Sequence, residues 1–448
     1  MSKAPHVIVI GAGTGGMCLA HGLKRAGIPV DVYEADRTRQ DGLYGYRVGI
    51  DPDGSRALSE CLSPELYKTF VATCARGPRY FNILTEKDSA VLSMKLPPDD
   101  DPIDSEKSVS RMTLRQVLLT GLEDVVHFGK RFTRYEKTRD GRVTAFFEDG
   151  SSVTGDVLVA ADGTGSRVRK QYLPHAELVE AGVIAVAAKV ALTERTKELL
   201  TPEVFEGISL VFAPKGYFNI FHVMEFKWDR EGHTKAGIGG NERDLISKWP
   251  GLLYDNTRDY INWGFAAATH RYPENVLKMR GTELMELVLE MTPDWHPNYR
   301  ELFRLTDPST CFPINIMTSK PIPQWPTSNI TLIGDAIHTM TPGRGVGANT
   351  ALRDAALLTK NLTAARDGKW SVIDAINDYE SQMVKYGFKA VKESLKQQGG
   401  DDVLHKPVIG RMALSGMRTS FRLVNAIPPL KRQFAKGLLG SRGSDKAS

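Results

Sequence analysis

The sequence lacks the features that mark secreted, zinc-binding or membrane-spanning chains. Its four cysteines among 448 residues form no CxxC pair and no cysteine–histidine metal spacing. This scarcity fits a reducing compartment and argues against a disulfide framework or a structural metal. No apolar run approaches the ~20 residues of a membrane span. The run Val7–Ile10 meets a glycine turn too soon to be part of a signal peptide, so we expect a cytoplasmic protein.

Strong net charge is also absent, although the charge is unevenly placed. The formal net charge is +5, and from Val403 onward nine Lys and Arg residues stand against one Asp, a surplus of eight. The chain before this point is therefore slightly acidic. A nucleic-acid-binding protein would need a basic face on its main fold, so we expect no nucleic-acid partner.

The first informative segment is HVIVIGAGTGGMCLAHGLKRAGIPVDVYEA, residues 6–35. Its pattern predicts a strand, a helix and a second strand over 7–10, 17–25 and 30–33. Three glycines have GxGxxG spacing: Gly11, Gly13 and Gly16. Glu34 closes the second strand at the usual distance for an acid that accepts ribose hydroxyls. The unit predicts a dinucleotide site with its pyrophosphate at the helix N-terminus, without separating NAD from FAD.

Three further segments carry polar residues next to predicted strands or helices. In DVLVAADGTGSRVRKQYL (156–173), a buried strand breaks at Asp162. In SRMTLRQVLLTGL (110–122), Arg111 stands just before an amphipathic helix. In LIGDAIHTMTPGRGVGANTALRDAA (332–356), a strand stops at Gly334-Asp335, and a glycine-rich turn leads into a helix near Asn349.

Together these motifs resemble the single-component FAD-dependent aromatic hydroxylases, the family typified by p-hydroxybenzoate hydroxylase. The resemblance covers most of the chain and implies an α/β fold: a Rossmann-like FAD-binding domain, an inserted mixed β-sheet substrate domain and a C-terminal helical tail. The expected boundaries are 1–178 and 319–395 for the FAD-binding domain, 179–318 for the substrate domain and 396–448 for the tail. A hairpin over 79–94 would join the substrate sheet.

The resemblance also implies cofactor contacts. Glu34 would bind the adenosine ribose, Arg111 the phosphate or ribityl region, and Asp335 a ribityl hydroxyl. Glycines in the turn would let the backbone approach a flat flavin ring, and the helix N-terminus would stabilise negative charge on the reduced ring. The full predicted set is Gly11, Gly13, Thr14, Gly15, Gly16, Glu34, Ala35, Arg47, Arg111, Asp162, Gly334, Asp335, Pro342, Gly345, Gly347, Ala348 and Asn349.

Other interpretations of single residues stay open at this point. Asp335 could simply cap a helix, Arg47 could be a surface charge, and His338 could be structural or catalytic. We name no catalytic side chain other than Arg47 as a candidate, because the flavin would carry the chemistry. Phe221 and Trp263 are the aromatic residues chosen as walls of a substrate pocket, with sheet core as the alternative.

The implied function is an FAD- and NAD(P)H-dependent monooxygenase that uses O2. It would hydroxylate or epoxidise an apolar aromatic or terpenoid-like molecule through a C4a-hydroperoxyflavin, in secondary metabolism or aromatic catabolism. The alternatives are a flavin-dependent dehydrogenase or reductase of the same fold, and a flavin-binding protein without activity. We expect a monomer or a homodimer.

The basic tail has helical periodicity. One predicted helical face carries Ile409, Ala413, Met417, Phe421 and Val424, and the nearly opposite face carries Arg411, Arg418 and Arg422. We expect Pro428-Pro429 to stop this helix. The apolar face could dock on the protein itself, or it could lie on a membrane surface.

Overall fold

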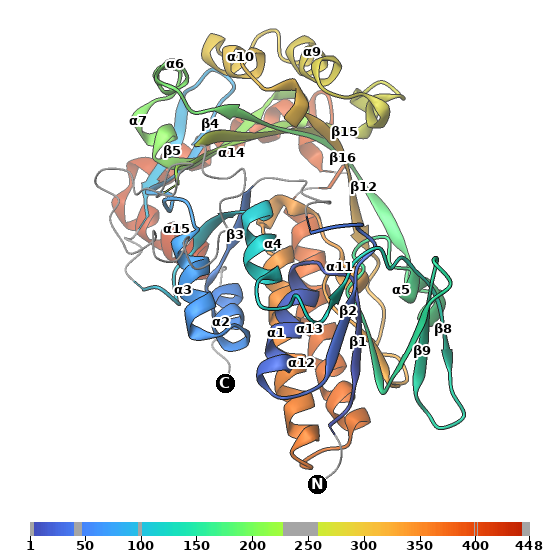
Figure 1. The fold of residues 1–448 in the computed structure, drawn as a ribbon. Coiled ribbons are helices and arrows are strands. Elements are labelled where there is room, and N and C mark those ends of the chain that lie inside the picture. Colours follow the sequence, from blue (N-terminus) through green and yellow to red (C-terminus); the bar gives the residue numbers. More distant parts are fainter. Residues whose placement is uncertain are drawn as a thin grey trace.

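The computed structural model describes residues 4–39, 47–96, 101–226, 259–397, 399–400 and 402–440. These residues form an α/β structure with a parallel sheet in one half and a larger mixed sheet in the other (Figure 1). The fold class predicted from the sequence is confirmed. In the described ranges, no helix is long and apolar enough to cross a membrane.

A five-stranded parallel sheet forms the centre of the first half. Its order is β17 (Ile330–Leu332), β11 (Val157–Ala160), β1 (Val7–Ile10), β2 (Val30–Tyr33) and β7 (Val126–His127). The residues of β1, β11 and β17 are all buried, as expected for parallel strands covered on both faces.

Helices and a small sheet cover the two faces of this parallel sheet. The helices packed together here are α1 (Thr14–Arg25), α2 (Pro52–Cys61), α12 (Gly347–Arg366) and α13 (Val372–Gln397). The small antiparallel sheet comprises β8 (Phe132–Lys137), β9 (Val143–Phe147) and β10 (Ser152–Gly155). Phe147 of this small sheet stacks on Tyr33 of β2, with ring centroids 4.7 Å apart.

A seven-stranded sheet forms the second half. Its order is β16 (Phe312–Ser319), β12 (Leu178–Ala191), β15 (Tyr260–Ala268), β14 (Tyr217–Met224), β13 (Gly207–Ala213), β4 (Tyr80–Leu84) and β5 (Ala90–Lys95). Only the β13–β4 pair is parallel among the described strands of this sheet. The β4–β5 hairpin thus extends the sheet at one edge.

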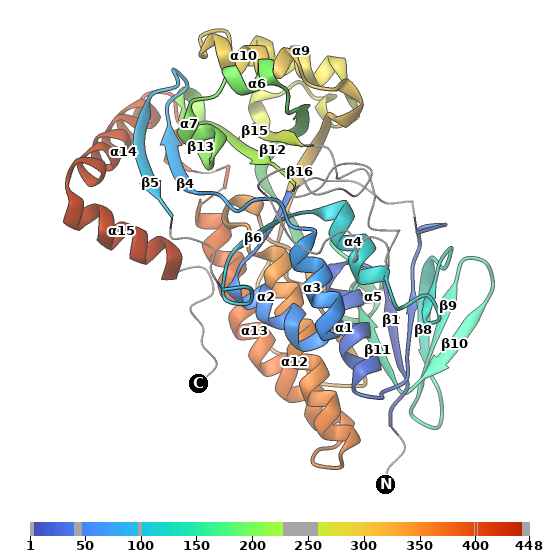
Figure 2. The same ribbon diagram turned by 60° about the vertical axis from the view of Figure 1, so that its left-hand side comes forward.

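Helices cover this sheet from outside. One side carries α9 (Thr282–Met291) and α10 (Pro297–Arg304), with the short helices α6 (Glu194–Glu198) and α7 (Pro202–Phe205) nearby. Figure 2 shows α14 (Ile409–Ala426) and α15 (Pro428–Gly440) beside the β4–β5 edge. Pro428 begins α15 rather than only ending α14, which suits the preference of proline for the first helical turn.

Phe221 and Trp263 lie in the core beneath α9 and α10 rather than in a pocket. Phe221 packs 4.9 Å from Tyr299, and Trp263 packs 4.8 Å from Phe303, measured between ring centroids. Both side chains are almost completely buried. Side chains alternate between the two faces of a strand, and these two point to the helix-covered face. The sequence could not show which face that is.

A buried carboxylate links α13 to the parallel sheet. Glu380 accepts hydrogen bonds from Trp325 Nε1 (3.2 Å), Thr331 Oγ1 (2.9 Å) and Thr327 Oγ1 (2.7 Å). Burial raises the pKa of Glu380 from 4.5 to about 7, although the three hydrogen bonds oppose this rise. The folded protein therefore binds a proton here at a pH where the unfolded chain has lost it.

Because the folded-state pKa is raised, this proton stabilises the fold below the unfolded pKa of 4.5, and the stabilisation is lost as pH rises through about 7. Glu380→Gln keeps the shape of the neutral acid. We expect its stability to match wild type at pH 5 and to exceed it by up to about 3 kcal/mol at pH 8. Urea unfolding at both pH values measures this. If the two proteins differed in free energy of unfolding by the same amount at pH 5 and at pH 8, Glu380 would not have a raised pKa.

Candidate functional site

Segments far apart in the sequence meet at the carboxyl ends of β1, β11 and β17. A Cβ on Gly11 would lie 2.4 Å from the carbonyl oxygen of Ala161, and Gly11 has φ +105°. A Cβ on Gly16 would lie 2.3 Å from the carbonyl oxygen of Gly11. Both positions exclude any side chain, so the first glycine motif is packed directly against the strand end that precedes Asp162.

The segment 332–356 packs against the same strand ends. A Cβ on Gly15 would lie 3.2 Å from the carbonyl oxygen of Ala351, and one on Gly334 would lie 2.9 Å from the Ala351 Cβ. The first turn of α1 therefore packs against the first turns of α12. Ligands of open parallel sheets bind at this carboxyl edge.

The two helices present N-termini without side-chain caps. Gly13 precedes α1 and Val346 precedes α12, and neither offers a side chain that accepts a hydrogen bond. The first N–H groups of an α-helix have no partner within the helix. Each helix start can therefore donate to an anionic group placed at this edge.

The carboxylate of Glu34 is fixed at the end of β2. Its Oε2 accepts from the Ala12 N–H at 2.7 Å, and its Oε1 accepts from the Asp36 N–H at 2.9 Å. The side chain thus lies against the first glycine turn. A carboxylate has further lone pairs that can accept hydroxyl groups of a ligand.

Asp335 lies close enough to Arg111 for the two charges to interact. Asp335 is the first residue of α11 (Asp335–His338), and no side-chain cap is formed there. Its side chain reaches solvent although protein surrounds it closely. Burial raises the pKa of Asp335, while His338 and Arg111 nearby lower it. The interpretation of Asp335 as a simple helix cap therefore has no support in the geometry.

A short ribbon places Arg47 beside Arg111. Strands β3 (Arg47–Ile50) and β6 (Lys107–Ser110) are antiparallel, with Arg47 opposite Ser110, and Arg111 then begins α4 (Arg111–Leu119). Arg47 donates to Ser108 Oγ at 3.2 Å and pairs with Glu106 at 3.4 Å. It is held within the protein and is not a free surface charge.

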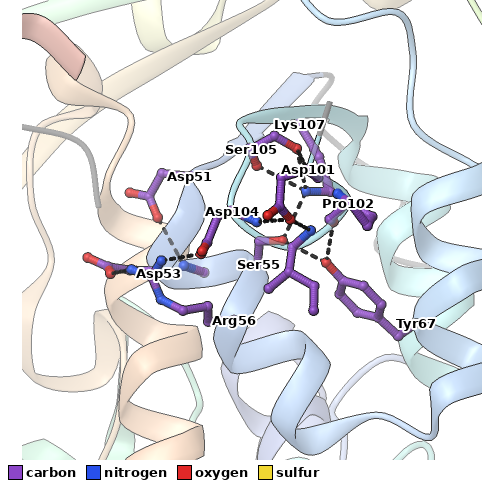
Figure 3. A network of polar contacts seen from close by, with 12 residues as sticks. Asp51, Asp53, Ser55, Arg56, Tyr67, Asp101, Pro102, Asp104, Ser105 and Lys107 are labelled. Atoms are coloured by element: carbon purple, nitrogen blue, oxygen red, sulfur yellow. Dashed lines mark hydrogen bonds and ion pairs between the residues drawn. The ribbon is translucent and has the colours of Figure 1, made fainter. Parts of the chain in front are cut away.

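A polar network supports this ribbon from below (Figure 3). Lys107, only 4% exposed, donates to Ser55 Oγ at 3.0 Å and to the carbonyl oxygen of Ser105 at 3.0 Å. The hydroxyl of Tyr67 lies 2.8 Å from Ser55 Oγ and donates to the carbonyl oxygen of Pro102 at 2.7 Å. The network joins α2 and α3 (Pro64–Ala72) to the start of β6.

Asn349 fixes the glycine-rich turn, and Arg169 fixes the helix α11 that precedes the turn. Asn349, 3% exposed, accepts from the Asp51 N–H at 3.0 Å and donates to the carbonyl oxygens of Gly49 (2.9 Å) and Gly345 (3.1 Å). The side chain is therefore used in contacts within the protein. Arg169 of α5 (Arg167–Tyr172) donates to the carbonyl oxygens of Ala336 and Thr164, each at 2.9 Å.

Asp162 leaves one polar atom without a partner. Its Oδ2 accepts from the Arg167 N–H at 2.8 Å, but its buried Oδ1 has no hydrogen bond. Burial raises the pKa of this carboxyl. Thr341 Oγ1, in the segment before the glycine-rich turn, is also buried without a partner. Unpaired buried polar atoms at one edge are typical of a ligand site.

A small apolar cavity of about 60 Å³ lies between the seven-stranded sheet and the glycine-rich turn. Gly343 borders it from the turn, and His405 borders it from η8 (Val403–His405). Nδ1 of His405 is buried without a hydrogen-bond partner. The sheet residues along the cavity are mostly apolar and include Val183, Leu210, Phe212, Tyr217, Phe218 and Ala266. Phe221 and Trp263, which the sequence predicted as pocket walls, are not among the residues that line it.

Comparison with known proteins connects this geometry to a family. Residues 310–394 match a family model described as an FAD binding domain. A solved structure from Photorhabdus luminescens, described as an FAD-containing monooxygenase, is 33% identical to this chain. It covers 87% of this chain and 96% of its own, with a TM-score of 0.74.

The chain belongs to the single-component FAD-dependent monooxygenases. A dual O-methyltransferase/FAD-dependent monooxygenase of Phaeosphaeria nodorum is 31% identical over 79% of this chain. The present chain spans only 40% of the length of that relative. It spans 44% of the length of two similar dual enzymes, from Cercospora beticola and Cercospora nicotianae. The HpxO structure of Klebsiella pneumoniae with FAD and uric acid has the same fold, at 23% identity and a TM-score of 0.74 over 97% and 96% of the two chains.

The residues at the carboxyl edge fit FAD. The site offers two uncapped helix N-termini for phosphate and flavin charge, a carboxylate at the end of β2, and the unpaired Asp162 Oδ1 between them. The predicted residues come from five segments at this edge, namely 11–16, 34–35, 111, 162 and 334–349, and from Arg47 beside Arg111. Their individual contacts with FAD stay predictions.

Asp335→Ala tests the central one of these contacts. Loss of a hydrogen bond to a charged group should weaken FAD binding by roughly tenfold or more. The measurement is FAD titration followed by flavin fluorescence. Asp140→Ala, an exposed carboxylate in the turn between β8 and β9, is the matched control and should bind like wild type. Equal affinities in the two variants would show that Asp335 does not anchor the cofactor.

Proposed function

We propose that this chain hydroxylates or epoxidises an apolar aromatic or terpenoid-like small molecule, with FAD as cofactor and NAD(P)H and O2 as co-substrates. The observation that supports it best is the position of the apolar cavity. One wall is the seven-stranded sheet, and another includes Gly343 of the turn whose end leads into the uncapped N-terminus of α12. A substrate there would lie next to the predicted flavin site.

We assign cofactor binding and substrate binding to different sheets. The half built on the parallel sheet would hold FAD, and the half built on the seven-stranded sheet, over about residues 179–318 with the β4–β5 hairpin, would hold the substrate. The apolar lining would exclude water. Exclusion of water strengthens electrostatic interactions and limits side reactions.

Bound FAD would supply hydride acceptance and O2 activation, chemistry that side chains do not provide. In the balanced reaction, NAD(P)H gives two electrons as hydride and the substrate gives two more. One oxygen atom enters the substrate and the other leaves as water. The N–H groups at the start of α12 would stabilise negative charge on the ring edge, while Glu34 and Asp335 would hold the adenosine and ribityl ends.

His405 is the polar residue we assign to substrate orientation. His405 borders the cavity and its Nδ1 has no hydrogen-bond partner, while burial lowers the pKa of the ring, so the imidazole is neutral near pH 7. A neutral imidazole can accept or donate one hydrogen bond. The substrate we expect is therefore mostly apolar and carries one hydroxyl, carbonyl or amine group.

His405→Ala should raise KM by about fivefold to tenfold, because the hydrogen bond contributes about 1 kcal/mol, and should leave FAD occupancy unchanged. Steady-state kinetics with the best compound of a panel measures this. His175→Ala, exposed after α5, is the control. If both variants had wild-type KM, His405 would have no part in substrate binding.

The proposed function itself is tested by NADPH and NADH consumption against a panel of aromatic and terpenoid compounds under labelled O2. We expect one or more compounds to accelerate consumption, with one labelled oxygen atom per product molecule. Substrate oxidation without label in the product would indicate a dehydrogenase. Bound FAD that no compound and no reduced nicotinamide can turn over would indicate a flavin-binding protein without activity.

A further inference from the structure

Within the described residues, α14 carries an exposed apolar face in addition to the one that packs on the protein. On the opposite side, α14 packs on β5: Phe421 and Val424 join the cluster that includes Leu92, and the Ser93 N–H donates to Asn425 Oδ1 at 3.3 Å. One of the two interpretations from the sequence, docking of the tail on the protein, thus matches the contacts of this face.

The packed face differs from the one that the sequence pattern suggested. Arg418 was placed opposite the apolar residues, yet it pairs with Glu86 and donates to the carbonyl oxygen of Phe212 at 2.6 Å, so it faces the protein. Ile409 was placed on the docking face, yet it is exposed. The periodicity of the sequence predicted the helix. It could not show which apolar residues pack on the protein and which stay exposed.

The outward stripe of α14 has an unusual composition. Its exposed fractions are 72% for Val408, 71% for Met412, 57% for Ile409 and 55% for Leu423. These positions recur at helical spacing on one side, and Ile427 continues the row at the end of the helix. The stripe has two apolar ends, since the exposed residues Ser415, Gly416, Thr419 and Ser420 lie between Met412 and Leu423. Single exposed apolar residues are ordinary, but several on one face of a helix mark a candidate binding surface.

Positive charge borders this stripe. Arg411 and Arg422 are exposed next to it, and Arg432 and Lys436 are exposed on α15. The sequence from Ile409 to Gly440 contains no Asp or Glu. A second copy of the chain would bring these cations together without an acidic partner on either pair of helices. A nucleic acid would complement the charge but would leave the apolar stripe unused.

We propose that the outer face of α14 and α15 binds an anionic lipid surface. The stripe Val408, Ile409, Met412, Leu423 and Ile427 would enter the boundary between headgroups and acyl chains. The flanking arginines and lysines would meet anionic headgroups. This combination of an apolar face with basic flanks is what interfacial helices use. The surface lies at the outer edge of the molecule in Figure 2.

The position of the stripe has a consequence for the cavity. Val408 follows His405 by three residues, and His405 and Leu404 border the cavity. A membrane-bound chain would therefore hold the cavity near the lipid, where an apolar substrate is concentrated. This consequence rests on the proposed function, whereas lipid binding does not.

Co-flotation of the full chain with vesicles tests the proposal. We expect binding to phosphatidylcholine vesicles that contain about 30% phosphatidylglycerol, and at least tenfold weaker binding to phosphatidylcholine alone or at high salt. The double variant Met412→Asp, Leu423→Asp should bind the anionic vesicles at least tenfold more weakly, because two apolar side chains no longer enter the lipid. Circular dichroism confirms that the variant is folded.

Ile373→Asp is the matched control, since Ile373 is an exposed apolar residue at the start of α13, a helix that packs on α12 beside the parallel sheet. It should bind like wild type. Failure of the wild-type chain to bind anionic vesicles would overturn the proposal, as would equal binding by the α14 variant. A dimer that the α14 substitutions dissociate, without lipid binding, would assign the face to a second copy. None of these outcomes depends on oxygenase activity.

Discussion

The geometry of the site depends on one buried carboxylate, that of Asp354. It accepts hydrogen bonds from the Gly334 N–H at 2.7 Å and from the Tyr386 hydroxyl at 2.6 Å, and it lies 2.7 Å from His338 Nε2. Burial lowers the pKa of His338, but Asp354 beside it, together with the charge of Asp335, raises that pKa above its ordinary value. Removal of any partner would leave a buried charge uncompensated.

This constraint explains why the turn can be rich in glycine and still hold one shape. Gly334 is fixed by Asp354 and packs against Ala351. Asp335 follows Gly334 directly and interacts electrostatically with Arg111, while His338 is fully buried and bonded to Asp354. The glycines provide room for a ligand, while Asp354, Asn349 and Arg169 provide the rigidity that a site requires.

The sequence predicted the parts of this arrangement that local patterns encode. The strand over 7–10, the acid at Glu34 and the start of a helix at Arg111 follow from periodicity and glycine spacing. The family resemblance added the cofactor and the fold. The Asp354 hydrogen bonds and the Arg169 link could not be predicted, because each joins residues of ordinary type whose proximity exists only after folding. Phe221 and Trp263 illustrate the same limit, since alternation along a strand defines two faces without saying which layer each one meets.

The central claim is that separate segments converge on one extended FAD molecule. The most direct measurement is a crystal structure of the chain with FAD. The account predicts continuous cofactor density from Glu34, past the N-terminus of α1, to Asp335 and the backbone at Gly345–Asn349. Density that avoids Asp335, or a purified chain that takes up no FAD, would contradict it.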